Sequence, residues 1–391
     1  MKFIKQNHDN SKYVDNIFVV SNAAKKDNDP STINASIGSF YDDDKKLLTF
    51  QSVFNSFRSL SDIQLSAYSE GPKGNQKYIE SLTKFVLEDK IKNVRMVATS
   101  GGTGAISLGV NLFLNEKDTI LIPDVAWGNY QLICKENNLN VVTYDPYNID
   151  EIIEKTNNLE KIFIIINSPC QNPCGNSFTY EQWKKLIDHL NGLDKEVIIL
   201  NDVAYLDYAN DVNSKRYFEL FNDLNENVLV LIGYSCSKSF SFYGLRLGAL
   251  FIINSNEELL NEIENQCAKH NRTVYSSVNN GAMITVSDVI DNHLEEYKKE
   301  KQESINLLKQ RADSFIEEAN IVGLDYYPYQ EGFFITLRIK DNETRDILHQ
   351  KLIENHIYTI KVNKGIRIGI CAIKTSSING LAEKIKNIIN G

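Results

Sequence analysis

Six short apolar runs recur along this chain between segments with helical patterns. The runs are rich in β-branched residues and lack a regular polar alternation, a pattern typical of strands buried on both faces of a mostly parallel sheet that helices cover. They lie at residues 94–99, 119–123, 162–166, 197–200, 228–232 and 250–253. Together they predict the α/β class, with a three-layer α/β/α core over about residues 46–305.

The C-terminal part of the chain has a different pattern. Residues 288–319 are rich in Glu, Lys, Gln and Leu and contain no Gly or Pro, which predicts one or two long helices. Two strand patterns and two helical patterns follow, at 332–338, 366–370, 345–355 and 378–389. We therefore expect a smaller α+β domain and divide the chain into an N-terminal arm that joins this domain, a large domain and the small domain, at 1–45, 46–305 and 306–391.

Charge and cysteine usage narrow the possible partners. The formal net charge is -9 without a basic block, which argues against a nucleic-acid or anionic membrane partner. No run approaches the roughly 18 apolar residues of a membrane span, and residues 1–7 lack the apolar core of a secretion signal. The six cysteines show neither a disulfide nor a zinc spacing, so we expect reduced thiols, no metal site and a cytoplasmic location.

Polar residues follow five of the predicted strands. In an open parallel sheet, ligands bind beyond the carboxyl ends of the strands, where helix N-termini offer free N–H groups. The first strand leads into the glycine-rich turn 100–105, which could cradle a phosphate. The next four strands lead, in order, to Trp127, to Asn172, to Asp202 with Tyr205, and to Lys238.

The lysine segment, residues 235–248, combines a reactive amine with a candidate anion site. Ser235 and Ser237 flank Lys238, and Arg246 lies between two glycines. Pyridoxal phosphate (PLP) needs such an amine for its aldehyde, an anion site for its phosphate, a carboxylate for its pyridine nitrogen, donors for its phenolate oxygen and a flat face for its ring. We assign the carboxylate to Asp202.

Each of these residues alone has a structural explanation. The glycine turn could simply begin a helix, Asp202 could cap one, Asn172 and its proline could form a turn, and Trp127 could fill the core. A lone lysine is usually a solvated surface residue. Their joint order and their positions at strand ends favour the cofactor site.

With these residues in this order, the chain resembles the class I aminotransferases of fold type I, and among them the aspartate and aromatic aminotransferase branch. Residues 17–24 and 34–38 are similar to that branch's N-terminal arm and substrate-covering loop. The resemblance implies a Schiff base of PLP with Lys238 and ring pairing by Asp202. It also implies stacking on Trp127, phenolate contacts from Asn172 and Tyr205, and phosphate contacts from Gly102, Thr103, Ser235, Ser237 and Arg246.

The resemblance also implies how substrates and subunits are arranged. Arg367, in the strand pattern 365–370, would hold the substrate α-carboxylate in a bidentate fork. Arg272 would reach across a dimer to a dicarboxylic side chain, and Tyr68 would cross to the neighbouring phosphate and join the catalytic residues. The substrate-binding set is then Gly38, Trp127, Asn172, Arg272 and Arg367, in an obligate homodimer with shared sites.

Three positions depart from the branch. Tyr130 stands where many members have a histidine near the pyridinium carboxylate, and Cys174 replaces the usual threonine. Ser277-Val278-Asn279 replaces Asn-Pro-Pro after Tyr275-Ser276, which weakens the alignment of Arg272.

The expected activity is a ping-pong transamination through Lys238. An L-amino acid (aspartate, glutamate or aromatic) would give its amino group to a 2-oxo acid such as 2-oxoglutarate. A PLP-dependent β-lyase that cleaves C–S bonds stays open as an alternative, because the same electron sink serves elimination. A non-catalytic PLP-binding regulator is less favoured, since no helix-turn-helix segment or basic region precedes the arm. The glycine turn lacks the third glycine of a nicotinamide-dinucleotide site.

Overall fold

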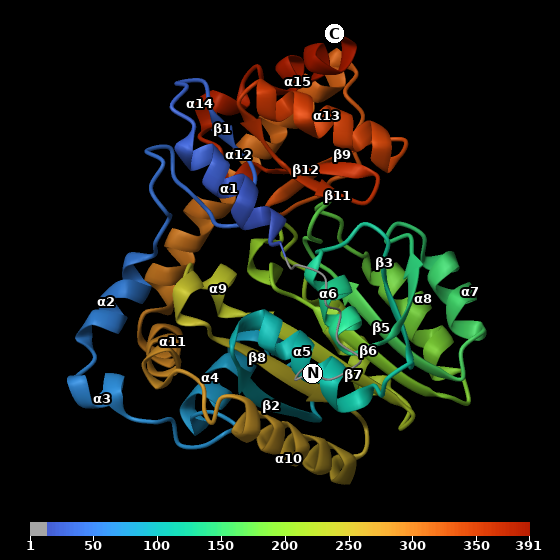
Figure 1. Ribbon diagram of the computed structural model, residues 1–391. Coiled ribbons are helices and arrows are strands. Elements are labelled where there is room, and N and C mark those ends of the chain that lie inside the picture. The colour runs from blue at the N-terminus through green and yellow to red at the C-terminus, as the bar shows by residue number, and fades with distance from the viewer. Residues whose placement is uncertain (1–13) are drawn as a thin grey trace, which may run out of the picture.

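The computed structural model of the chain describes residues 14–391. Residues 1–13 lie outside the described residues. They include the first part of the predicted arm and residues 1–7, where no secretion signal is predicted. The chain forms a larger unit around a central sheet and a smaller unit that gathers both ends of the described chain (Figure 1). Among the described residues, no helix is both long and apolar enough to cross a bilayer.

The larger unit contains a seven-stranded sheet within the described residues, in the order β2-β8-β7-β6-β5-β3-β4. Every neighbouring pair is parallel except the two that involve β8, which runs antiparallel to β2 and β7. The mostly parallel sheet is confirmed. The strands are β2 (Val94–Thr99), β3 (Thr119–Pro123), β4 (Asn140–Tyr144), β5 (Lys161–Asn167), β6 (Glu196–Asp202), β7 (Val228–Ser235) and β8 (Gly248–Ile253).

The strand β4 has no counterpart among the six predicted runs. It lies at the edge of the sheet beside β3, and three of its five residues are exposed. An edge strand needs no continuous apolar run, because one side faces solvent. The buried-run signal therefore missed it.

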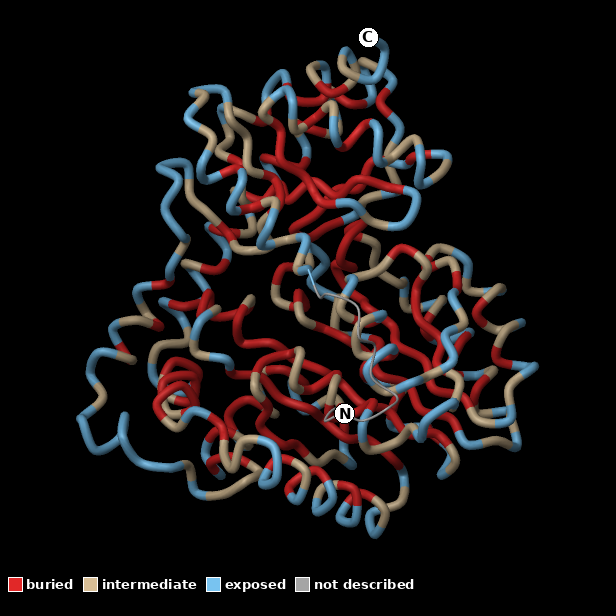
Figure 2. Tube along the Cα trace, in the orientation of Figure 1, coloured by how far each residue is buried: buried red, intermediate tan, exposed pale blue. Residues whose placement is uncertain are grey.

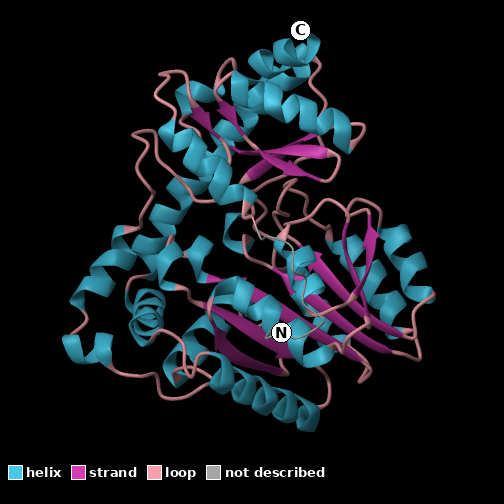
Figure 3. Ribbon diagram, in the orientation of Figure 1, coloured by secondary structure: helices cyan, strands magenta, loops and turns pink. Residues whose placement is uncertain are grey.

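Helices and 3-10 turns surround this sheet (Figure 3). The helices are α2 (Gln51–Ser59), α3 (Asp62–Ser66), α4 (Gln76–Leu87), α5 (Gly101–Phe113), α6 (Asn129–Glu136), α7 (Ile149–Asn157), α8 (Tyr180–Asn191), α9 (Cys236–Ser239), α10 (Glu257–Val274) and α11 (Asn280–Asn292). The 3-10 turns are η1 (Leu206–Tyr208), η2 (Arg216–Asp223) and η3 (Tyr243–Leu245).

The central strands send alternate side chains into two separate cores. Along β5, Ile162, Ile164 and Ile166 join the core beneath α4, α8 and α11, whereas Phe163 and Ile165 join the core beneath α5, α6 and α10. Successive residues of a strand point to opposite faces, so an unbroken apolar run buries both faces of the sheet. The burial map shows the central strands as the buried middle layer (Figure 2). This arrangement confirms the three-layer α/β/α fold.

The smaller unit has its own core and two small sheets. An antiparallel sheet has the order β11-β12-β9, and β1 pairs in parallel with β10, which brings the N-terminal part of the chain beside its C-terminal part. The strands are β1 (Ile33–Asn34), β9 (Phe334–Arg338), β10 (Ile357–Tyr358), β11 (Ile360–Val362) and β12 (Gly365–Gly369). The helices are α1 (Asn16–Lys26), α12 (Leu294–Val322), α13 (Asn342–Glu354), η4 (Ile370–Ala372), α14 (Thr375–Ile378) and α15 (Leu381–Asn390).

Two helical predictions need refinement. The long helical region breaks at His293 between α11 and α12. The last helix is divided into α14, which ends at Ile378, and α15, whose N-cap Gly380 has a φ of +80°. The helix α12 runs unbroken past residue 305, with Tyr297 in a core of the larger unit and Phe315 in that of the smaller unit. The division at 45/46 and 305/306 stays a prediction.

Candidate functional site

Lys238 lies where β7 ends and α9 begins, with Ser235 closing the strand before it. Its Nζ donates a hydrogen bond of 2.6 Å to the carbonyl oxygen of Gly38, in the loop after β1. The same nitrogen lies 4.8 Å from the ring centroid of Tyr243 and 5.7 Å from that of Tyr205. Aromatic faces and one carbonyl thus surround the amine.

Burial changes the chemistry of this lysine. Burial is the main cause that lowers the pKa of Lys238 from 10.5 to about 8, with the positive charges of Arg367 and Arg246 acting in the same direction and Cys371 opposing them. A larger fraction of the amine is therefore neutral, and nucleophilic, near neutral pH than in a solvated lysine.

The N-terminus of α5 forms a compact anion cradle with Arg246. Gly101 begins the helix with a φ of +73°, and a Cβ there would lie 2.5 Å from Arg246 Nη2. A Cβ on Gly102 would lie 3.0 Å from the Cβ of Ser235. Arg246 Nη1 donates to Ser237 Oγ over 2.9 Å. The free N–H groups of the helix, the hydroxyls of Ser235 and Ser237 and the Arg246 guanidinium thus lie close together, an arrangement that suits a phosphate. Thr103 lies half-buried in the first turn of this helix.

Asp202 ends β6 and is 4% exposed. Its Oδ2 accepts a hydrogen bond of 2.5 Å from the hydroxyl of Tyr130, and its Oδ1 accepts one of 3.0 Å from the backbone N–H of Ala204. Burial raises the pKa of Asp202 from 3.8 to about 6, although both hydrogen bonds favour the charged form. No ion pair to Asp202 occurs within residues 14–391, so the carboxylate is left to pair with a cationic ligand.

Arg367 lies on β12 and is 3% exposed. Its Nη2 donates to the carbonyl oxygen of Ser36 over 2.8 Å, and its Nη1 donates to Asn172 Oδ1 over 3.2 Å. The guanidinium lies 4.3 Å from the ring centroid of Phe334, while Nε has no hydrogen-bond partner among the described residues. Burial lowers the pKa of Arg367 from its ordinary value. A buried guanidinium with an unpaired N–H is suited to a carboxylate.

The structure brings the predicted amine, anion cradle, carboxylate and guanidinium into this network, but three predicted residues lie differently. Trp127 is half-buried and meets the Tyr130 ring edge to face, with centroids 5.6 Å apart. Tyr68 is 85% exposed. Arg272 is also exposed and its Nη1 donates to Ser276 Oγ. The predicted cross-subunit roles of Tyr68 and Arg272 concern a second chain, and these roles and the predicted ring stacking of Trp127 stay predictions.

Several residues of the network could not be singled out from the sequence. Gly101, Ser36 and Tyr243 lie inside the segments 100–105, 34–38 and 235–248, yet their contacts depend on backbone geometry. Phe334 and Cys371 come from the smaller unit, where a strand pattern was the only signal. The thiol of Cys371 donates to the carbonyl oxygen of Ser39 over 3.5 Å, and burial raises its pKa to about 12.

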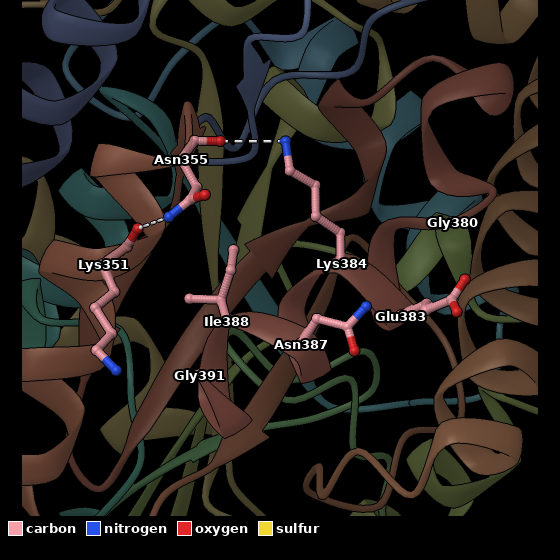
Figure 4. Close-up of a pocket in the computed structure, with 8 residues that line it drawn as sticks. All are labelled: Lys351, Asn355, Gly380, Glu383, Lys384, Asn387, Ile388 and Gly391. Carbon is pink, nitrogen blue, oxygen red and sulfur yellow. Dashed lines mark hydrogen bonds between the residues drawn. The ribbon is translucent and has the colours of Figure 1, made fainter.

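Two cavities elsewhere contain none of these residues. A depression of about 640 Å³ lies beside α15, where Lys384 Nζ donates to the carbonyl oxygen of Asn355 over 3.2 Å (Figure 4). Another, of about 560 Å³, is lined by residues of α5 and α10 and of the segments that begin β6 and β7. Neither contains a nucleophile beside an anion cradle, so we locate the site around Lys238.

Comparison with known proteins identifies the family. The family of class I and II aminotransferases matches residues 30–385. This chain belongs to that family. Membership makes the protein a PLP-dependent aminotransferase and confirms the predicted enzyme class and cofactor.

Individual relatives agree with this assignment. The aminotransferase is 23% identical to the mitochondrial aspartate aminotransferase of Xenopus tropicalis, over 96% of this chain and 91% of that protein. Its structure is similar to that of an aminotransferase from Anaerococcus prevotii DSM 20548, with a TM-score of 0.92 and 29% identity over the full length of both chains. A Burkholderia pseudomallei aromatic-amino-acid aminotransferase covalently bound to PLP matches with a TM-score of 0.81 and 22% identity, over 97% of this chain and 98% of that one. The fold of these aminotransferases is the predicted one.

The residues of this aminotransferase fit the cofactor. The cradle at Gly101 and Gly102 leaves room that a side chain would fill, Arg246 and two serines supply donors for a phosphate, and Asp202 is a buried carboxylate without a cation. Lys238 supplies an amine with a lowered pKa. These four features match the phosphate, the ring nitrogen and the aldehyde of PLP.

Proposed function

We propose that this enzyme transfers an amino group from an L-amino acid, either aspartate, glutamate or an aromatic one, to a 2-oxo acid such as 2-oxoglutarate by a ping-pong mechanism. One observation carries the proposal. Lys238 and Arg367 are both anchored to the segment 36–38, the lysine through Gly38 O and the arginine through Ser36 O. An amine and a carboxylate-binding guanidinium therefore share one site.

Each residue has a defined task in this proposal. When bound, PLP supplies an aldehyde that captures amines and a ring that accepts the electron pair left at Cα. Lys238 is the amine that would hold the cofactor covalently until the substrate amine displaces it. The freed Nζ would then take the Cα proton and return it to the former aldehyde carbon of the cofactor. Asp202 holds the proton on the ring nitrogen. The cradle of α5 and Arg246 binds the phosphate.

Substrate orientation rests on Arg367. Its two Nη atoms already lie within reach of oxygen acceptors, Ser36 O and Asn172 Oδ1, so a substrate carboxylate can take similar positions at little cost in reorganisation. Fixing the α-carboxylate while the amine is held by the cofactor restricts rotation at Cα and directs the proton toward Lys238.

A homodimer completes the proposed site. Tyr68 is 85% exposed and Arg272 is exposed too, and apolar side chains near them in sequence are also exposed: Ile63 at 80% and Val274 at 61%. Contiguous exposed apolar surface is typical of an interface, and we propose that these two segments contribute to one. We propose that a second chain covers them and that Tyr68 and Arg272 enter the partner's site. We also propose a cytoplasmic location, in line with six free cysteine thiols.

The reaction class can be tested directly. The purified enzyme is incubated with 2-oxoglutarate and aspartate, tyrosine or phenylalanine, or with oxaloacetate and glutamate, and the new amino acid and the new 2-oxo acid are measured. A parallel reaction with an S-alkyl cysteine is assayed for pyruvate and ammonia. Amino transfer without ammonia release is expected. Release of pyruvate and ammonia without amino transfer would establish the β-lyase instead, and neither reaction in a PLP-loaded protein would favour a regulator.

A further inference from the structure

We infer that Tyr130 is a positioning residue for the cofactor, which fixes the orientation of Asp202 through its hydroxyl and of Trp127 through its ring. The inference rests on the proposed function, in which Asp202 pairs with the ring nitrogen, and on the ring stacking by Trp127 that the family resemblance implies. It assigns a role to the residue that departs from the family's usual histidine.

Tyr130 contacts both Asp202 and Trp127, the two residues expected to bind the cofactor ring. Tyr130 lies in the first turn of α6, is fully buried, and donates its hydroxyl to Asp202 Oδ2 over 2.5 Å. Its ring meets the ring of Trp127 edge to face at 85°, and its backbone N–H donates to the Trp127 carbonyl oxygen over 3.0 Å. Among residues 14–391, Tyr130 alone both donates a hydrogen bond to the Asp202 carboxylate and meets the Trp127 ring.

The electrostatics around Asp202 make the hydroxyl important. Within residues 14–391 the carboxylate accepts from two neutral donors, the Tyr130 hydroxyl and the Ala204 N–H. Removing one of two donors from a buried charge costs far more than removing a solvated hydrogen bond. Tyr130 therefore contributes to the charged state of Asp202 as well as to its orientation.

A phenol also keeps the donor of this contact neutral. Burial, and then the charge of Asp202, raise the pKa of Tyr130 well above its ordinary value of 10. The other titratable groups that act on Tyr130 are the phenols of Tyr144, at the end of β4, and Tyr205 after β6, and burial raises both pKa values in the same way. The hydroxyl thus stays a neutral donor over the whole working range, which an imidazole would not.

Three variants test the role. Tyr130→Phe keeps the ring and removes the hydroxyl, and Tyr130→His restores a donor. Tyr144→Phe is the matched control, because it removes another fully buried phenol, which donates to Ile165 O over 2.6 Å and does not touch Asp202. The dissociation constant of PLP is measured by titrating the apoprotein and following the visible absorbance of the lysine-bound cofactor, with thermal unfolding of the apoprotein recorded alongside.

We expect Tyr130→Phe to weaken PLP binding roughly tenfold or more, the effect of losing a hydrogen bond to a charged group, and Tyr130→His to recover part of it. The kcat should fall while KM for the amino donor, held by Arg367, stays within about twofold, since Tyr130 does not touch that guanidinium. Both Phe variants should lower the unfolding temperature, but Tyr144→Phe should leave PLP affinity unchanged.

Two results would overturn the inference: PLP affinity of Tyr130→Phe within twofold of wild type, or an equal loss in Tyr144→Phe. Failure of the proposed function looks different. In that case the wild-type protein itself would show no PLP absorbance that depends on Lys238.

Discussion

Lys238 Nζ and the carbonyl oxygen of Gly38 are 2.6 Å apart, although they lie 200 positions apart in the sequence. Lys238 follows a strand of the larger unit, and Gly38 belongs to the loop after β1, which pairs with β10 of the smaller unit. The reactive amine therefore lies at the junction of the two units. A Cβ at Gly38 would lie 3.2 Å from the Phe334 ring and 3.9 Å from Lys238 Nζ, so a side chain there would crowd the amine.

The lowered pKa of Lys238 predicts how cofactor attachment depends on pH. Only the neutral amine attacks an aldehyde, and burial brings its pKa down from 10.5 to about 8. The rate at which the apoprotein binds PLP covalently should therefore rise with pH and reach half its maximum near pH 8. Stopped-flow absorbance at a series of pH values checks this, with free Nα-acetyl-lysine as the control. A midpoint above pH 10, like that of the control, would contradict the account.

The glycines of α5 offer a matched pair of substitutions. Gly101→Ala places a side chain at a φ of +73° and 2.5 Å from Arg246 Nη2, so it should destabilise the protein by about 1–2 kcal/mol and weaken PLP binding. Gly104→Ala, inside the same helix, meets no atom nearer than 3.5 Å and should be neutral or stabilise by roughly 0.5–1 kcal/mol. Urea unfolding and PLP titration compare the two. Equal PLP affinity in both variants would argue against the cradle.

Arg272 is the residue expected to select the side chain of the substrate. Arg272→Ala should raise KM for aspartate and glutamate about tenfold or more, as expected for loss of a charge-assisted hydrogen bond, and leave KM for phenylalanine unchanged. Steady-state kinetics with each donor provide the measurement. The control is Arg216→Ala. Arg216 is an exposed residue of η2 whose guanidinium stacks on the ring of Tyr180 in α8. If acidic and aromatic donors respond alike, Arg272 does not bind the distal carboxylate.

Lys301 predicts an unusual dependence of stability on pH. The residue is 6% exposed, and its Nζ has no hydrogen-bond partner within residues 14–391 and lies 4.0 Å from the ring centroid of Tyr208 and 4.8 Å from that of Phe50. Burial lowers its pKa from 10.5 to about 7, against the opposing charge of Asp207. Between pH 7 and 10.5 the unfolded chain binds the proton and the folded chain does not, so this residue makes stability rise with pH over that window.

Replacing Lys301 tests this directly. Lys301→Met should increase the free energy of unfolding at pH 6 by about 1–4 kcal/mol, since an unpaired buried charge is removed, and the gain should shrink toward pH 10. Urea unfolding at both pH values gives the two gains. Lys298→Met is the control, since that side chain is 57% exposed on the same helix. A loss of stability at pH 6 in Lys301→Met alone would show that the amine has a stabilising partner.

The sheet and the strand-end residues could be predicted because burial on both faces leaves a continuous apolar run. That signal located every strand of the described central sheet except β4, whose exposed edge position removes it. Asp202 and Lys238 were predictable for the same reason, since each follows such a run and thus lies at the ligand-binding edge. Their chemistry followed from residue type and position alone.

The parts that stayed hidden depend on how distant segments meet. The hydrogen bonds from Lys238 to Gly38 and from Arg367 to Asn172 require the smaller unit to pack against the larger one, and no local pattern encodes that docking. The hydrogen bond from the Tyr130 hydroxyl to Asp202 is likewise a tertiary contact that no local pattern encodes. The roles of Tyr68 and Arg272 could be predicted only from the family resemblance, because a single chain leaves both side chains exposed.

The central claim, that Lys238 is the amine that binds PLP, can be tested by one measurement. The PLP-loaded enzyme is reduced with borohydride, digested, and mapped by mass spectrometry, together with Lys238→Ala and the exposed-lysine control Lys269→Ala. The account predicts a phosphopyridoxyl group on the peptide that contains Lys238 in the wild type and in Lys269→Ala. Lys238→Ala should keep a native circular dichroism spectrum, carry no label and lose turnover. A label on another lysine, or wild-type half-reaction rates in Lys238→Ala, would contradict the account.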